Sequence, residues 1–456
     1  MIVIPEQGHF TDQEIEDIAT QFFTSKEYKR MQEYQAYYEQ HNSKLRSQVE
    51  DKMYRNKTPN NYVPTPYYAT VVDTMAGYLY QNVQYESENE QYAEELNLIL
   101  DANLQEIKDM RTGTYSLAFN RGVELVYTEG DESNTDIKFA SFNPLEWALV
   151  FNDKIEPDVW CGIRLSVSNS EDYDYNVDVV YKDKWQKGQM KFDSSIKTAQ
   201  FVPGEERPLF FPECPVVNYP SEIIGYQSPF HVVITYIQAL DYLMTSNSDE
   251  IEKLTEALLI LGKTLKDEDL KNLNELKALM DIDKEEIEPK FLEKQMSPEF
   301  RKYVSELLIN EIHKHSHVID WYSPDSGMSG QVSSKALRTR LFDMDMFSRR
   351  IEQVFRQGTD KRIRLINFLM NAKGLPVDEV KIIFNRTVPS DFYDKIEAFK
   401  NVTNISNRTQ WEELGLDADE EEKRLEEQKK NAVDIFEMPT RGDDEEAGEE
   451  DTEDVQ

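Results

Sequence analysis

The strongest constraint on the fold is one apolar repeat that runs from Ser334 to about Asn371. Its apolar side chains recur every three or four residues, the spacing of one helix face: Leu337, Leu341, Met344, Phe347, Ile351, Phe355, Ile363, Ile366 and Leu369. Gly374 and Pro376 follow the repeat and are typical of a helix end. At ~1.5 Å per residue such a helix would be about 55 Å long. Because most globular helices are much shorter, the repeat predicts a helix that belongs to a large assembly.

The charge of this predicted helix is opposite to that of the chain. The 456 residues carry a formal net charge of −36, which argues against a surface that grips nucleic acid through general basicity. The helix is rich in arginine, and its basic face could contact either nucleic acid or acidic residues of another subunit. In so acidic a chain, ion pairs between subunits are the simpler interpretation. The residues concerned are Arg338, Arg349, Arg350 and Arg356.

The first part of the chain is predicted to be helical. From Asp12 to about Met53 the pattern is helical and charged, with one apolar face that includes Ile15, Ile18, Phe22 and Phe23. A proline-rich joint follows. Thr65 is then expected to cap a helix that has Pro66 at its first position and ends near Asn82. A further helix is expected from Glu90 to about Asp109.

Between Gly113 and Tyr219 the period changes to two, which predicts an antiparallel β-rich domain with hairpins. Its aromatic residues are expected in the core rather than in a ligand site: Phe142, Trp147, Phe151 and Trp160. The two cysteines, Cys161 and Cys214, are too few for a disulfide framework. We therefore expect buried thiols and a reducing compartment.

Helical periodicity returns at Ser228-Pro229, and a second helix is predicted from Ser297-Pro298. Residues 259–295 lie between them, so the pattern indicates a helical hairpin with a small module inserted at its tip. After the long helix, VKIIFNR predicts a strand before a last helical portion. The final residues, GDDEEAGEEDTEDVQ, contain too little apolar surface to fold and are predicted to be disordered.

Three features could indicate chemistry, and each has a simpler explanation. Gly262-Lys263-Thr264 fits a relaxed nucleotide-binding pattern, but the preceding LLIL is suited to a buried strand or helix end rather than to a glycine-rich phosphate loop. His313, His315 and His317 are two residues apart, so on a helix they point in different directions and favour no metal site. No nucleophile and base pair is recognisable. The sequence predicts no enzyme, no cofactor and no metal, and it shows neither a signal peptide nor a membrane span, as expected of a soluble, intracellular protein.

The order of these segments resembles the portal proteins of tailed bacteriophages, particularly long-tailed phages of Gram-positive hosts. The resemblance extends from about Asn60 to Asn431 and rests on the collinear order of several stretches rather than on one motif. They are NNYVPTPYYATVVDTMAGYLYQNVQY, SLAFNRGVELVY, FNPLEWALVFND, VVNYPSEIIGYQSPFHVVITYIQALDYLMTSNSDEIEKLTEALLILG, SGQVSSKAL and RTVPSDFYDKIEAFKNVTNISNRTQWEELGLDADEEEKRLEEQ.

The resemblance implies an α+β portal fold. It has a β-rich wing, a helical stem, a small α/β clip, a long wing helix with a tunnel loop, a helical crown and a disordered acidic tail. Carried onto this sequence, the parts are 1–227 wing, 228–258 first stem helix, 259–295 clip, 296–320 second stem helix, 321–334 tunnel loop, 335–374 long wing helix, 375–440 crown and 441–456 tail.

The resemblance also implies a homo-oligomeric ring, usually of twelve subunits, at one capsid vertex of the virion, with assembly in the host cytoplasm. Double-stranded DNA would pass through its channel, and its partners would be the terminase large subunit, a head–tail adaptor, and capsid and scaffold proteins, without a membrane. The tunnel loop would face DNA through Asp325, Ser326, Gly327, Met328, Ser329, Gly330 and Gln331, and the stem cations opposite phosphates would be Arg301, Lys302 and Lys314. Two alternatives stay open: an adaptor or scaffold without a channel, and a nucleotide hydrolase that uses Lys263.

Overall fold

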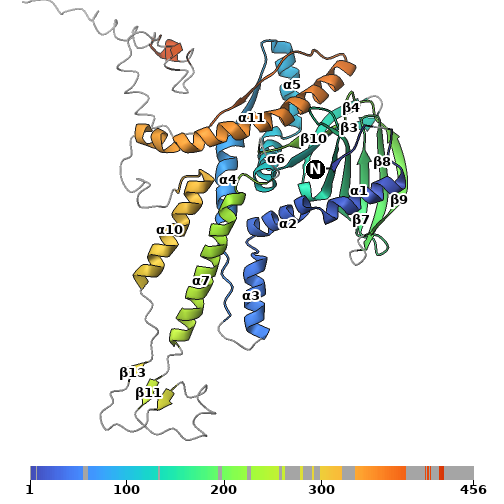
Figure 1. The fold of residues 1–456 in the computed structure, drawn as a ribbon. Helices are drawn as coiled ribbons and strands as arrows, with labels where there is room; N and C mark the ends of the chain where they lie inside the picture. Colours follow the sequence, from blue (N-terminus) through green and yellow to red (C-terminus); the bar gives the residue numbers. More distant parts are fainter. Residues whose placement is uncertain are drawn as a thin grey trace, which may run out of the picture. The chain divides into compact units, whose positions relative to one another are not determined.

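The computed structural model shows a chain of mixed helices and sheets, as the α+β prediction requires (Figure 1). The chain divides into two compact units, one of residues 1–332 and 336–387 and the other of residues 333–335 and 388–456. The structure describes residues 2–6, 8–54, 60–131, 134–193, 198–222, 227–255, 259–261, 278–280, 290–291, 298–320, 334–386, 406, 408–409, 411, 418 and 421–425.

The N-terminal region contains successive helices, as predicted: α1 (Asp12–Thr24), α2 (Lys26–Tyr38), α3 (Ser43–Tyr54) and α4 (Tyr67–Tyr80). α1 begins with a capping box, in which the Thr11 hydroxyl accepts from the backbone of Glu14 and the Glu14 carboxylate accepts from the backbone of Thr11. The prediction that Thr65 caps α4 is wrong. The N-cap is Pro66, without a side-chain bond, and the Thr65 hydroxyl instead donates to Asp241.

The single helix predicted from Glu90 to Asp109 is two helices, α5 (Glu90–Ala102) and α6 (Gln105–Phe119). Leu104 lies between them with φ of 52°, a left-handed conformation that a helical period does not reveal. The strand region also begins later than predicted, because α6 continues through Gly113. A Cβ at Gly113 would lie 2.1 Å from Cδ2 of Tyr80, so the glycine is needed for close packing of the Tyr80 ring rather than to end the helix.

The predicted β-rich region forms two sheets. The larger has the order β1-β5-β6-β7-β8-β9, with β1 parallel to β5 and every other pair antiparallel. Its strands are β1 (Ile2–Val3), β5 (Trp147–Phe151), β6 (Val159–Val167), β7 (Tyr175–Val180), β8 (Lys184–Asp193) and β9 (Thr198–Pro208). The smaller sheet is antiparallel and consists of β10 (Val216–Tyr219), β3 (Gly122–Asp131) and β4 (Asn134–Phe142).

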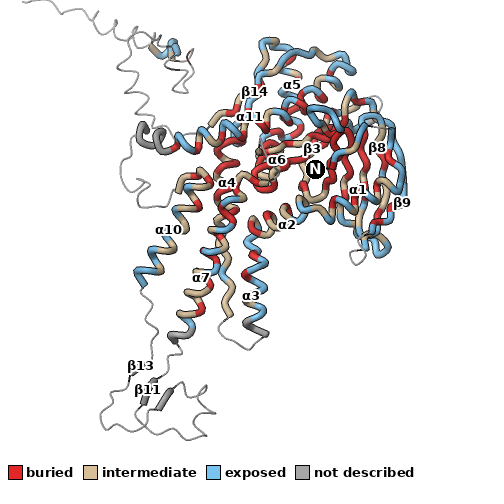
Figure 2. The backbone as a smooth tube through the Cα atoms, in the orientation of Figure 1, coloured by how far each residue is buried: buried red, intermediate tan, exposed pale blue. Residues whose placement is uncertain are grey.

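A hydrophobic core is formed between these sheets, where the tube in Figure 2 shows continuous burial. Trp147 is fully buried there, Phe151 and Trp160 are also buried, and Phe142 packs against the cluster from its edge. Cys161 and Cys214 are free and buried, as predicted. Burial raises the pKa of both thiols, so neither is set up as a nucleophile.

The predicted helical hairpin consists of α7 (Ile234–Thr255), which follows a short 3-10 helix η2 (His231–Val233), and α10 (Pro298–Ser316). Between them lie three short strands: β11 (Leu259–Leu261), β12 (Ala278–Met280) and β13 (Lys290–Phe291). LLIL therefore supplies a strand, and Lys263 lies outside the described residues.

The long helix α11 spans Ser334–Ala372, almost as the apolar repeat predicts, and Gly374 follows it with φ of 74°. The strand predicted at VKIIFNR is β14 (Lys381–Phe384), which pairs antiparallel with β2 (Val83–Glu86). Residues 375–386, which include β14, belong to the predicted crown, and isolated residues from Ser406 onward are its other described parts. The predicted acidic tail lies outside the described residues.

Candidate functional site: the helical hairpin and the long helix

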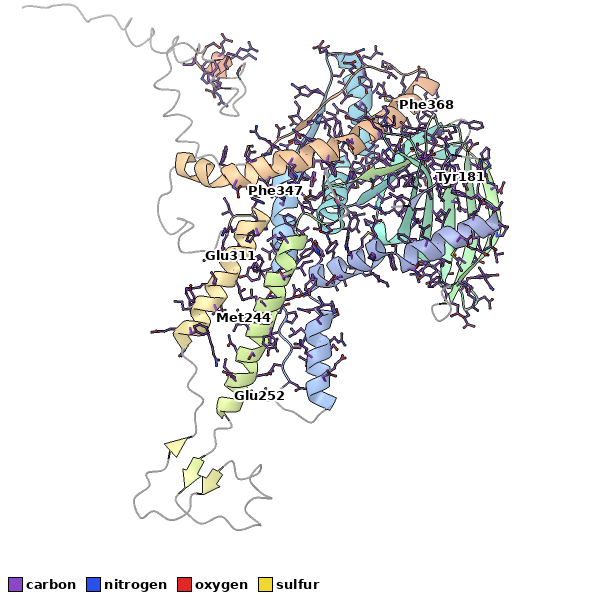
Figure 3. The ribbon with its side chains drawn as sticks, viewed as in Figure 1. Tyr181, Met244, Glu252, Glu311, Phe347 and Phe368 are labelled. Atoms are coloured by element: carbon purple, nitrogen blue, oxygen red, sulfur yellow. The ribbon has the colours of Figure 1, made fainter. Side chains whose placement is uncertain are left out.

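The hairpin is held together by polar and aromatic contacts between α7 and α10. The guanidinium of Arg301 on α10 pairs with the carboxylate of Glu250 on α7, and both side chains are about four-fifths buried. Further along, the His315 ring stacks on Tyr236 with centroids 5.4 Å apart. Figure 3 shows Met244 and Glu252 along α7 and Glu311 on α10.

The three cations predicted to face phosphates have different surroundings. Arg301 is directed at Glu250 within the hairpin, as described above. Lys302 and Lys314 are exposed, and each lies near a carboxylate of its own helix, Glu306 at 3.8 Å and Glu311 at 3.4 Å. Exposed ion pairs of this kind contribute little to stability, so both ammonium groups are available to an outside anion.

The basic face predicted on α11 is used largely within the chain. Arg349 pairs with Asp345 one turn earlier, Arg350 pairs with Glu222, and Arg356 pairs with Glu352 while donating to the carbonyl of Ile382. Arg349 and Arg350 nevertheless remain 61% and 47% exposed. The side chain of Arg338 lies outside the described residues, as do residues 325–331, the part of the predicted tunnel loop (321–334) that was expected to face DNA.

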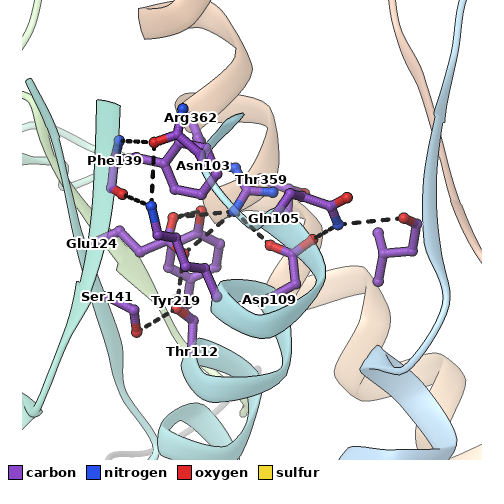
Figure 4. Close-up of polar contacts among 12 residues, drawn as sticks. Asn103, Gln105, Asp109, Thr112, Glu124, Phe139, Ser141, Tyr219, Thr359 and Arg362 are labelled. Carbon is purple, nitrogen blue, oxygen red and sulfur yellow. Dashed lines mark hydrogen bonds and ion pairs between the residues drawn. The ribbon is translucent and has the colours of Figure 1, made fainter. Parts of the chain in front are cut away.

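Arg362, in contrast, is fully buried and fixes the second half of α11 to the rest of its unit (Figure 4). Its Nη1 lies 2.5 Å from Oδ1 of Asp109 on α6 and 3.3 Å from Oε1 of Glu124 on β3. Its other terminal nitrogen donates to the hydroxyl of Tyr85 on β2. One side chain of α11 therefore joins a helix and strands of two different sheets.

The carboxylate of Glu124 has two further donors. The hydroxyl of Tyr219 donates to Oε2 of Glu124 at 2.5 Å, and the hydroxyl of Thr112 donates to Oε1 of Glu124 at 2.8 Å. Burial raises the pKa of Glu124, and the Arg362 guanidinium opposes that shift. Because a buried charge is tolerated only when it is paired and hydrogen-bonded, these residues keep their geometry only as a set.

Sequence reasoning missed this cluster. Arg362 is one of many arginines on α11, and Asp109 and Glu124 are two of 87 acidic residues in the chain. The one available signal is that Arg362 lies on the apolar side of the helix, one residue before Ile363, whereas Arg349 and Arg350 lie on the opposite side.

The three histidines near the end of α10 serve three different contacts. His313 lies 3.0 Å from the carbonyl of Val318, and His317 lies 2.8 Å from the carboxylate of Asp343 on α11. His315 stacks on α7 as described above. The spacing argument applies only to His313 and His315, because α10 ends at Ser316 and His317 follows it with φ of 58°. No group of three possible metal ligands occurs among the residues that the structure describes.

Within the described part of the chain, no helix is both long enough and apolar enough to cross a membrane.

A long helix joined to a β-rich region and preceded by a two-helix hairpin is the architecture that the portal resemblance implied. A family model described as "Phage portal protein, SPP1 Gp6-like" matches residues 24–434. Because the match covers most of the 456 residues, the chain belongs to this family of phage portal proteins. Portal proteins are structural components as a family.

Structures of gene transfer agent particles resemble the chain. The structure titled "Neck of native GTA particle computed with C12 symmetry" is 11% identical, with a TM-score of 0.40, and the match covers 77% of this chain and 90% of that chain. The "Neck of empty GTA particle computed with C6 symmetry" is 10% identical, with the same TM-score and coverage. A comparison with curated protein sequences gives no match.

Proposed function

We propose that copies of this portal protein form a ring, of twelve subunits, whose central channel carries double-stranded DNA during packaging and ejection. The observation that best supports this is the family match over residues 24–434, which includes the hairpin and the long helix together. The ring would lie at one capsid vertex of the virion and be assembled in the host cytoplasm.

In this proposal the channel guides DNA without holding it. With a net charge of −36 per subunit, an acidic lining would repel phosphates and keep the duplex centred. The loop between the hairpin and α11 would follow the grooves through many weak contacts, and Gly327 and Gly330 would allow it several backbone conformations. Asp325, Ser326, Met328, Ser329 and Gln331 would supply the contacts.

The cations have separate roles in the proposal. Lys302 and Lys314 would meet phosphates, since both are exposed, whereas Arg301 would hold the hairpin through Glu250. Arg349 and Arg350, which are exposed on α11, would pair with acidic residues of the next subunit together with Arg338 and Arg356. A cyclic ring would repeat each such contact once per subunit.

The portal would contribute no chemistry of its own and need no cofactor. Its partners would be the terminase large subunit that drives packaging, a head–tail adaptor, and the capsid and scaffold proteins. Two competing functions are an adaptor without a channel and a nucleotide hydrolase that uses Lys263.

The first experiment is negative-stain electron microscopy of the purified protein, with mass measurement of the same sample. Rings with an open axial hole are expected. A species that stays monomeric at high concentration and with capsid scaffold present would contradict the channel.

Two further measurements separate the alternatives. ATP turnover by the pure protein, abolished in Lys263→Ala, would favour the hydrolase, and we expect none. If rings form, replacing residues 325–331 with a glycine–serine segment should lower DNA packaging while ring formation persists. Unchanged packaging would contradict the role of the loop.

A further inference from the structure

The segment before α4, residues 60–65, lies against α7 in a regular polar arrangement. It is neither helix nor strand, and it is preceded by residues outside the described part of the chain. Three of its backbone N–H groups donate to three side chains of α7. Asn61 donates to Asp249 at 2.9 Å, Val63 to Thr245 at 3.2 Å, and Thr65 to Asp241 at 2.7 Å.

The spacing of donors and acceptors explains why the arrangement is regular. The acceptors are four residues apart on a helix, which is a rise of about 6 Å. The donors are two residues apart in an extended chain, which is a rise of about 6.6 Å. The two repeats therefore stay in step over three contacts. Pro64, which has no backbone N–H, lies between the donors Val63 and Thr65, at a position where the arrangement needs no donor.

The acceptors are buried, which makes the contacts strong and specific. Asp241, Thr245 and Asp249 are 1%, 2% and 5% exposed. Side chains add to the backbone contacts, since the Thr65 hydroxyl donates to Asp241 at 2.6 Å and the Asn61 amide donates to Glu252 at 2.9 Å. Removing one partner of such a buried pair leaves the other without compensation.

The same contacts reach α3. Asn42, which precedes α3, donates from its amide to the second oxygen of Asp241 at 2.7 Å and accepts from the backbone N–H of Leu45 at 3.0 Å. The hydroxyl of Tyr62 accepts from the backbone N–H of Asn42 at 2.9 Å. Residues 60–65 are thus bound to α7, to the start of α3 and, through the chain, to the start of α4.

We propose that residues 60–65 are a strap that makes α7, the start of α3 and the start of α4 move as one body. When the hairpin helix α7 is displaced, the strap displaces the start of α3 and the start of α4 with it. That α7 is displaced by passing DNA rests on the proposed function, whereas the coupling itself is a property of the single chain.

The test is amide hydrogen exchange on the purified protein with Thr245→Val, an isosteric change that removes one acceptor. The Val63 amide should exchange about tenfold faster, the equivalent of one lost hydrogen bond. If the strap couples the helices, the Leu45 amide should also exchange several times faster, although no hydrogen bond joins Thr245 to Leu45 among the described contacts. Thr245→Ser keeps the hydroxyl, so both amides should exchange at the rates of the unaltered protein.

Thr235→Val is the matched control, because Thr235 is an exposed residue of α7 and its hydroxyl donates to the carbonyl of Val232 in the adjoining η2 rather than accepting from residues 60–65. It should leave both amides unchanged. Acceleration of Val63 alone would overturn the coupling, and acceleration of neither would overturn the strap. Neither readout needs a ring or DNA, so a failed strap and a failed channel are told apart.

Discussion

The second half of α11 and the α7–α10 hairpin are both helical, yet they differ in how far their large apolar side chains are buried. In α11, Phe355, Ile366 and Met370 are fully buried, and Arg362 is enclosed with its counter-charges. On α10, Phe300 and Tyr303 are 61% exposed and Leu307 is 44% exposed, all on the side away from the Arg301–Glu250 pair. The second half of α11 is thus packed largely within its own chain, whereas α10 has an exposed apolar stripe, although Phe342 and Met346 in the first half of α11 are exposed as well.

The largest expected effect is in the buried cluster. Arg362→Met should lower the free energy of unfolding by about 3–5 kcal/mol, because two buried carboxylates lose their cation. Arg364→Met is the control, since Arg364 is 59% exposed and pairs with Glu213 at 3.1 Å. Its cost should be below about 1 kcal/mol. Urea unfolding of both variants is the measurement, and equal midpoints would show that burial of Arg362 does not matter.

A sharper version of this test also replaces the two buried carboxylates with neutral amides. Asp109→Asn and Glu124→Gln, combined with Arg362→Met, should recover part of the loss because no unpaired charge is then buried. If the triple variant is less stable than Arg362→Met alone, the cluster stabilises the fold through hydrogen-bond geometry rather than through charge pairing.

The next effect concerns two glycines in helices of the same region. Gly113→Ala should destabilise by about 1–3 kcal/mol, because its Cβ would overlap the buried Tyr80 ring. Gly77→Ala has nothing within 4 Å of its Cβ and lies inside α4. It should stabilise by up to about 1 kcal/mol through helix propensity. Thermal unfolding should shift in opposite directions, and shifts of the same sign would refute the packing at Gly113.

The smallest effect is in the hairpin. Arg301→Ala removes the partly buried partner of Glu250 and should cost about 1 kcal/mol, whereas Lys302→Ala should stay within ~0.5 kcal/mol because its side chain is 77% exposed. Exchange of backbone amides in α10 reports both. If Lys302→Ala opens the hairpin as much as Arg301→Ala, the Arg301–Glu250 pair is not what joins α7 to α10.

Local patterns predicted the elements well where one period dominates. α11 matches its apolar repeat to within a residue, and the starts of α10 and β14 lie where they were expected. The errors occur where a long-range contact overrides a local rule. Gly113 looked like the start of the strand region, and Thr65 looked like a helix cap, but their roles depend on Tyr80 and on Asp241.

The sequence by itself determined the periodic elements, the acidic balance and the portal family, because each depends on neighbouring residues or on their order. Only the tertiary structure decided which charges are buried. Arg362 meets Asp109 across 253 residues of chain, and Thr65 meets Asp241 across 176. Pairing over such separations depends on how helices and sheets pack, and a spacing rule, which sees only near neighbours, contains no information about it.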